Sequence, residues 1–143
     1  DWWLPAAGDP LEPPWFRSSG ALFAAVRDLG EEGRWQHGLR VLLLDTVIPF
    51  AYGWALFRAA WFYLRRLDAP AALARLRWVP VAAMLCDFAE NACIATLLAA
   101  YPGRPGGVAA ALLAFAWAKW ALLALSVAGV LAATVLVRFR RPA

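Results

Sequence analysis

Long uninterrupted runs of apolar residues dominate the chain and determine its predicted architecture. Three runs are long enough to cross the hydrocarbon core of a bilayer, which takes about 20 helical residues: residues 41–64, 78–100 and 108–137. A membrane barrel strand needs only about 10 alternating residues, and the third run consists mainly of the good helix formers Ala and Leu. We therefore predict an all-α integral membrane protein, with three transmembrane helices in a bundle over residues 39–143.

Residues 1–38 precede the first span and are predicted to form an extracytoplasmic segment. Ser18 and Ser19 offer a helix cap after a proline-rich stretch, and Gly30 and Gly33 are expected to end the helix. Between these signals, apolar residues recur at helical spacing: Leu22, Phe23, Val26 and Leu29. The pattern predicts an amphipathic helix over residues 20–29 that lies at the membrane surface.

Arginine is distributed unevenly around the three spans. One arginine, Arg104, separates the second span from the third, whereas most others follow the first or third span: Arg65, Arg66, Arg75, Arg77, Arg138, Arg140 and Arg141. The arginine-rich sides of bacterial membrane proteins face the cytoplasm. We therefore expect a multi-pass protein of the bacterial cytoplasmic membrane, with residue 1 outside and the C-terminus inside. Several tryptophans suit the interface between lipid and water: Trp2, Trp3, Trp15, Trp35 and Trp78.

Composition narrows the class of protein. Apolar residues make up 63% of the chain and charged residues 17%, against about 45–50% and 25% in soluble domains. These values exclude a disordered chain and, without a basic tail, a typical nucleic-acid binder. Cys86 and Cys93 are seven residues apart, or about 10 Å along a helix, so they are not expected to bridge.

Ionisable and polar residues inside the spans are the candidate site. Counted from the outer helix ends at about 1.5 Å per residue, most of these residues reach a similar depth. The predicted intramembrane polar cluster consists of Asp45, Tyr52, Asp87, Glu90, Asn91 and Lys119. Asp87, Glu90 and Asn91 share one helix face, because residues three and four apart are neighbours on a helix surface. We expect Lys119, the single lysine, to pair with Glu90 or Asp87.

Two interpretations of this cluster stay open. Polar residues hold membrane helices together without any chemistry, and unequal buried carboxylates also mark sites of proton transfer or headgroup binding. The catalytic candidates are Asp87, Glu90 and Lys119. No metal site is expected, because His37 falls in the outer loop at no ligand spacing. Ser126 and Thr134 are expected to bond to their own backbone. No cofactor is predicted, although bound lipid or pigment fits such a chain.

Several of these residues also form a pattern along the chain. It runs through Gly30, Gly33 and Arg34, through Asp45, Pro49 and Tyr52, and through Asp87, Glu90 and Asn91 to Lys119. This pattern resembles a group of small bacterial multi-span membrane proteins to which no activity is assigned. The resemblance implies the fold and the polar cluster. Because such proteins usually carry a further hydrophobic segment upstream, it also implies a fourth span.

Two functions from different classes fit the sequence. The first is an accessory membrane subunit without catalytic activity, which docks on a larger complex of respiratory or photosynthetic type. Its partners would be membrane lipids and other membrane protein subunits, and the small residues Ala110, Ala114 and Ala118 would allow close helix contact. The alternative is an intramembrane enzyme or carrier acting on a lipid or isoprenoid, with Asp87 or Glu90 as acid and base. A pocket beside Glu90 would favour the enzyme, and a filled core would favour the subunit.

Overall fold

The computed structural model describes residues 18–139, and helices make up nearly all of this part of the chain. In chain order the elements are α1 (Ser19–Asp28), α2 (Gly30–Arg66), α3 (Ala71–Ala74), the 3-10 helix η1 (Arg75–Trp78), α4 (Val79–Ala99) and α5 (Gly106–Phe139). No strand occurs among the described residues. The predicted all-α class is confirmed.

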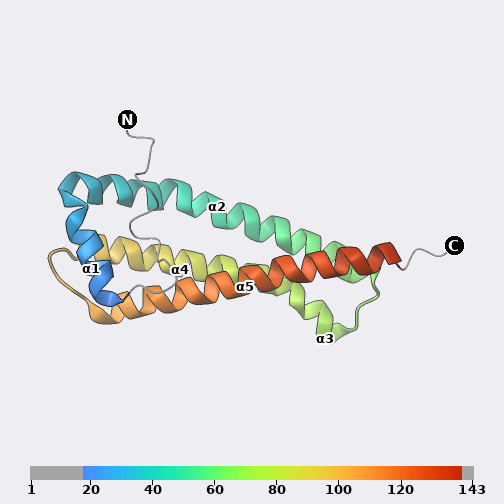
Figure 1. Ribbon diagram of the computed structural model, residues 1–143. Helices are drawn as coiled ribbons and strands as arrows, with labels where there is room; N and C mark the ends of the chain where they lie inside the picture. The colour runs from blue at the N-terminus through green and yellow to red at the C-terminus, as the bar shows by residue number, and fades with distance from the viewer. Residues whose placement is uncertain (1–17, 140–143) are drawn as a thin grey trace.

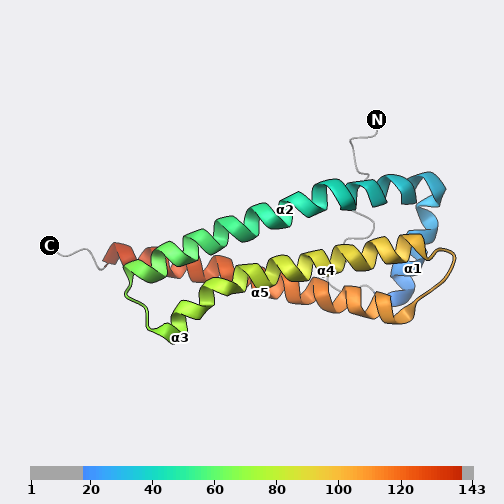
Figure 2. The same ribbon diagram turned by 180° about the vertical axis from the view of Figure 1, so that it is seen from behind.

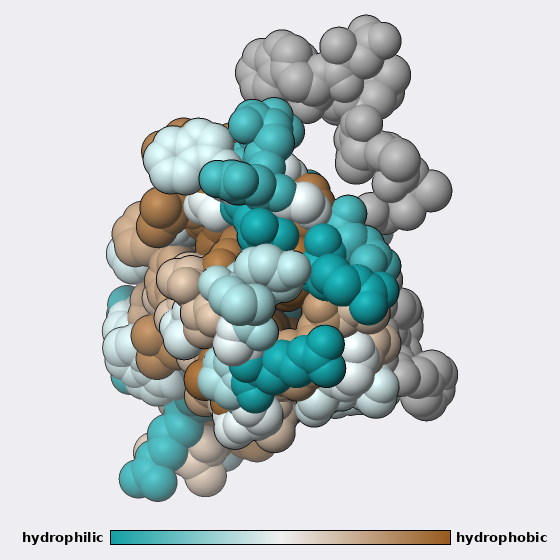
Figure 3. Space-filling model, turned by 90° about the vertical axis from the view of Figure 1, so that its left-hand side faces the viewer, coloured by the Kyte–Doolittle hydropathy of each residue, from teal (hydrophilic) through white to brown (hydrophobic). Residues whose placement is uncertain are grey.

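Three long helices, α2, α4 and α5, lie side by side as a bundle in which α4 runs antiparallel to α2 and α5 (Figure 1 and, from behind, Figure 2). The short helix α1 crosses one end of the bundle, and α3 with η1 lies toward the other. Figure 3 looks onto the end that carries α1 and shows hydrophilic side chains gathered there. Large apolar side chains are exposed along the flanks of the long helices, among them Leu43, Ile48, Leu125 and Leu131. Apolar flanks with a polar end are typical of a bundle that crosses a membrane.

The three long segments are each long and apolar enough to span a bilayer: 30–66, 71–99 and 106–139. At 1.5 Å per residue, the 37 residues of α2 and the 34 of α5 correspond to about 55 and 51 Å. Both helices therefore exceed the roughly 30 Å of a hydrocarbon core and must tilt or protrude. The predicted runs 41–64 and 108–137 lie inside these two helices.

The boundary between α1 and α2 is a sharp bend at a glycine. The hydroxyl of Ser18 accepts a hydrogen bond from the backbone N–H of Ala21 at 3.3 Å, as predicted for the cap of α1. Gly30 has φ +67°, a left-handed conformation that favours glycine, and it ends the first helix. The prediction that Gly33 also ends a helix is wrong, because α2 begins at Gly30 and continues through Gly33.

The apolar face of α1 packs onto the bundle. Leu22 is fully buried and Val26 is 3% exposed, in one core cluster with Val41, Ile94 and Leu112 from the three long helices. This face is covered by protein, whereas the prediction that the helix lies at the membrane surface stays a prediction. The face is covered because the bend at Gly30 turns α1 across the bundle end.

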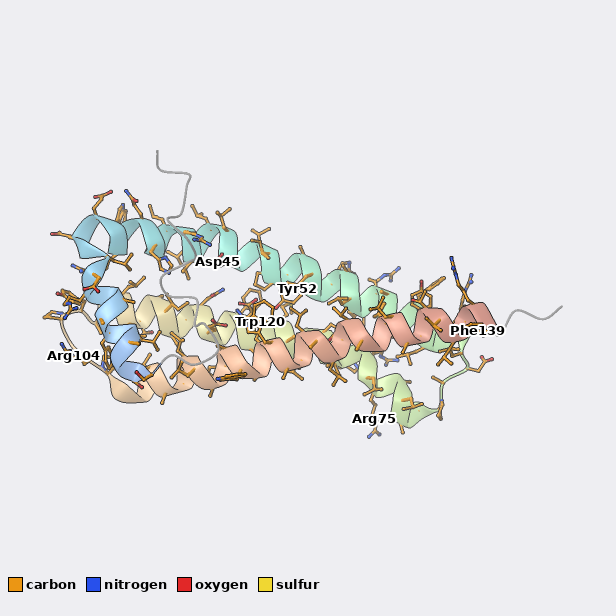
Figure 4. The ribbon with its side chains drawn as sticks, viewed as in Figure 1. Asp45, Tyr52, Arg75, Arg104, Trp120 and Phe139 are labelled. Atoms are coloured by element: carbon orange, nitrogen blue, oxygen red, sulfur yellow. The ribbon has the colours of Figure 1, made fainter. Side chains whose placement is uncertain are left out.

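Helices α2 and α4 are in close contact at Gly53. A Cβ atom placed on this glycine would lie 2.9 Å from the Cβ atom of Met84, closer than real side chains come. The buried glycine therefore sets the spacing of the two helices near the middle of the membrane-spanning region. One residue before it, Tyr52 points from α2 toward the interior (Figure 4).

Candidate functional site

A buried polar cluster joins the three long helices. The Tyr52 hydroxyl on α2 donates to Asp87 Oδ2 on α4 at 2.9 Å. Lys119 Nζ on α5 donates to Asp87 Oδ1 at 3.3 Å and lies 2.7 Å from Glu90 Oε2. The lysine thus contacts both predicted acidic partners rather than one, because residues three apart on α4 present their carboxylates to the same neighbour.

Burial makes these contacts energetically important. Glu90 is 1% exposed, Lys119 8% and Asp87 9%. Charge interactions strengthen in a medium of low dielectric constant, and an unpaired charge there is correspondingly expensive. Two carboxylates share one ammonium group, and the phenol adds a hydrogen bond without adding charge. The cluster therefore connects α2, α4 and α5 at one level of the bundle.

A second polar contact lies nearer the α1 end and supplies a hydrogen bond that α2 lacks at Pro49. Proline has no N–H, so the carbonyl of Asp45, four residues earlier, lacks its normal helical donor. Asn91 Nδ2 donates to this carbonyl at 2.7 Å from the neighbouring helix. Asp45 thus takes part in this contact through its backbone oxygen, and its side chain is half-buried. Proline inside a membrane helix is tolerated when a neighbouring helix supplies the missing bond in this way.

Other candidate residues have simpler structural roles. Ser126 and Thr134 donate to the carbonyls four residues earlier, Leu122 and Val130, at 2.7 Å each, as predicted. Cys86 and Cys93 are both free thiols. Within residues 18–139, no three His, Cys, Asp or Glu side chains gather as a metal site would need.

The placement of His37 differs from the prediction. It lies inside α2 and is 7% exposed, rather than in an outer loop. The helix begins eleven residues before the apolar run at Val41, at Gly30. Residues 30–40 at the start of α2 are largely polar, so hydropathy alone did not indicate that they belong to the helix.

Sequence analysis missed two groups of arginine contacts. At the α1 end, the Arg34 guanidinium stacks 3.9 Å from the ring centre of Tyr101. At the other end, the Arg77 guanidinium lies 4.3 Å from the ring centre of Trp61 and 5.7 Å from that of Trp78. The four-residue spacing of Trp61 and Arg65 could have indicated that these two side chains meet on one helix face. The 3-10 helix η1, which brings Arg77 back to α2, has no periodic pattern in the sequence from which its contact with Trp61 could be predicted.

Comparison of the chain with protein-family models, with curated proteins and with solved structures finds no significant match to any of them. The interpretation of the cluster therefore depends on its own geometry. A set of mutually bonded, buried groups is suited to holding helices together. Acid or base chemistry would further require that a substrate reach Glu90.

Proposed function

We propose that this chain is an accessory membrane subunit without catalytic activity, which docks laterally on a larger membrane protein assembly. The observation that carries the proposal is a closed polar core combined with tryptophans exposed on the outside near mid-span. The closed core argues for a structural role of the cluster. The exposed aromatic residues supply the docking surface.

The exposed tryptophans lie far from the depths that tryptophan prefers. Trp54 on α2 is 57% exposed and Trp117 on α5 is 47% exposed. At 1.5 Å per residue they lie about 20 and 14 Å from the starts of their apolar runs, within the hydrocarbon region. Tryptophan normally collects at the membrane interfaces, and aromatic residues are enriched in protein interfaces. Protein contact at mid-span therefore accounts for both positions better than lipid contact.

The alternative, an enzyme or carrier acting on lipid or isoprenoid, finds less support. Glu90, its best acid or base, is 1% exposed. Its carboxylate and that of Asp87 are both bound to Lys119. A general base must come within hydrogen-bond reach of the proton that it removes, and such a pose would first require the cluster to open.

Docking can be tested with variants of matched chemistry. In the wild-type chain, extraction in mild detergent followed by native gel electrophoresis should show the protein in a larger species, whose partner mass spectrometry identifies. Trp54→Leu combined with Trp117→Leu should reduce this fraction severalfold while helicity stays unchanged. Trp35→Leu, a control at a tryptophan 65% exposed near the bundle end, should leave it intact. A chain that migrates alone in every mild detergent would refute the proposal.

The orientation that we propose places the arginine-rich end in the cytoplasm of a bacterium. This end carries Arg58, Arg65, Arg66, Arg75, Arg77 and Arg138, and Figure 4 shows Arg104 at the opposite end from Arg75. In a chain without Cys86 and Cys93, a single cysteine at Ala69 should react with a membrane-impermeant thiol reagent only in inverted vesicles. A cysteine at Gly106 should react only in intact cells or right-side-out vesicles. Labelling from the reversed sides would overturn this orientation.

A further inference from the structure

The arginine-rich end holds a cavity of about 300 Å³ between the end of α2 and the segment of α3 and η1. Trp61, Leu64, Arg65, Asp68 and Arg77 line it. A neighbouring open groove of about 470 Å³ runs along α2 past Arg58, Arg65 and Arg66. We propose that this cavity binds the phosphodiester headgroup of an anionic phospholipid, a binding function distinct from docking on a protein partner.

Unpaired positive charge is the first observation that points to an anion. Within residues 18–139, no carboxylate forms an ion pair with Arg58, Arg65, Arg66 or Arg77. Arginine binds phosphate through paired N–H groups in a planar fork, so a phosphate group would supply the negative charge that these arginines lack.

The aromatic residues hold these guanidinium groups in position. Arg77 lies over the Trp61 ring at 4.3 Å, and Arg65 lies over the same ring at 6.0 Å. A guanidinium stacked on an aromatic face keeps its N–H edges available for a second ligand. Trp61 therefore places two arginines, from α2 and η1, around one cavity.

Two further features favour a lipid over free phosphate. Asp68 is among the residues that line the cavity, and its negative charge disfavours a ligand with two negative charges more than a phosphodiester with one. Leu64 also lines a second cavity of about 90 Å³, which is apolar and lies beside Leu76, Val79 and Leu125. A phospholipid can place its headgroup among the arginines and part of an acyl chain against this apolar wall. Basic pockets between membrane helices bind anionic headgroups in this way.

The test uses the purified full chain, delipidated in a neutral detergent, and counts retained lipid by native mass spectrometry. Phosphatidylglycerol should be retained at least tenfold more strongly than phosphatidylcholine. Arg65→Gln combined with Arg77→Gln should weaken phosphatidylglycerol binding about thirtyfold, the value expected for two basic residues near an anionic headgroup. Equal retention of the two lipids would overturn the proposal.

A control with the same change in net charge separates the site from general electrostatics. Arg75→Gln combined with Arg138→Gln alters the same end outside the cavity, and it should weaken binding less than threefold. Equal losses in the two double variants would refute a defined site. Inorganic phosphate should compete weakly with phosphatidylglycerol, and Asp68→Asn should strengthen that competition. Competition by phosphate as strong as that of the lipid would show a phosphate site rather than a lipid site.

Discussion

Removing the charge of Lys119 tests whether the polar cluster holds the bundle together. In Lys119→Met, the carboxylates of Asp87 and Glu90, which are 9% and 1% exposed in the wild-type structure, both lose their shared partner. Removing one member of a buried ion pair costs about 3–5 kcal/mol, because the remaining charge is left uncompensated. We therefore expect the free energy of unfolding to fall by about 4 kcal/mol.

Substitution of Glu90, one partner of Lys119, is expected to destabilise the protein less than substitution of Lys119. Glu90→Gln removes the ion pair with Lys119 but leaves Lys119 bonded to Asp87 at 3.3 Å. Because the ammonium keeps a carboxylate partner, the loss should be only about 1–2 kcal/mol. With both substitutions together, a single buried carboxylate stays without a cation. The combined loss should then fall about 2–3 kcal/mol below the sum of the single losses.

Unfolding by SDS in mixed micelles, followed by far-UV circular dichroism, measures all three variants. Ser126→Ala is the matched control on the same face of α5. Its hydroxyl donates to the carbonyl of Leu122 in its own helix, so its loss should change the unfolding free energy by less than about 0.5 kcal/mol. A loss below about 1 kcal/mol in Lys119→Met, or strict additivity in the double variant, would refute the role of the cluster.

Two helix contacts give further predictions for the same assay. Asn91→Leu should cost about 1–2 kcal/mol by removing the donor to the carbonyl that Pro49 leaves unbonded. Adding Pro49→Ala should recover most of this loss by restoring the helical N–H, and an equal loss in both backgrounds would contradict the contact. Gly53→Ala should cost about 1–3 kcal/mol, because its Cβ atom would meet Met84 at 2.9 Å. Met84→Gly, which removes the Cβ atom on the other side of this contact, should relieve that cost, and a Gly53→Ala variant as stable as wild type would contradict the close approach.

The sequence was enough to predict the three long helices and the meeting of Lys119 with Glu90. Apolar runs located the spans, and a constant rise per residue predicted that Lys119 and Glu90 lie at one level. Neither argument predicts how a helix is rotated about its axis, or where a helix ends when its last turns carry polar residues. For that reason His37 was placed in a loop, and the packing of Leu22 onto the bundle was not foreseen.

Contacts that depend on how helices cross were also beyond the sequence. The close approach at Gly53 is a property of two helices together, as is the meeting of Arg77 with Trp61. The bond from Asn91 to the Asp45 carbonyl was hidden for a further reason. The acceptor is a backbone carbonyl that Pro49 leaves without its helical donor, and the pattern of polar side chains along the sequence does not indicate such an acceptor.

The shared ammonium of Lys119 has a consequence for how the chain enters the membrane. During synthesis α4 emerges with Asp87 and Glu90 about 30 residues before their counter-ion appears, an interval of roughly 2–6 s at ordinary translation rates. A helix with two acidic groups near its middle inserts poorly alone. Only a short connection, residues 100–105, separates α4 from α5. Insertion of the two helices as one hairpin, with the charges already paired, avoids that barrier and makes α5 the element that completes the membrane insertion of α4.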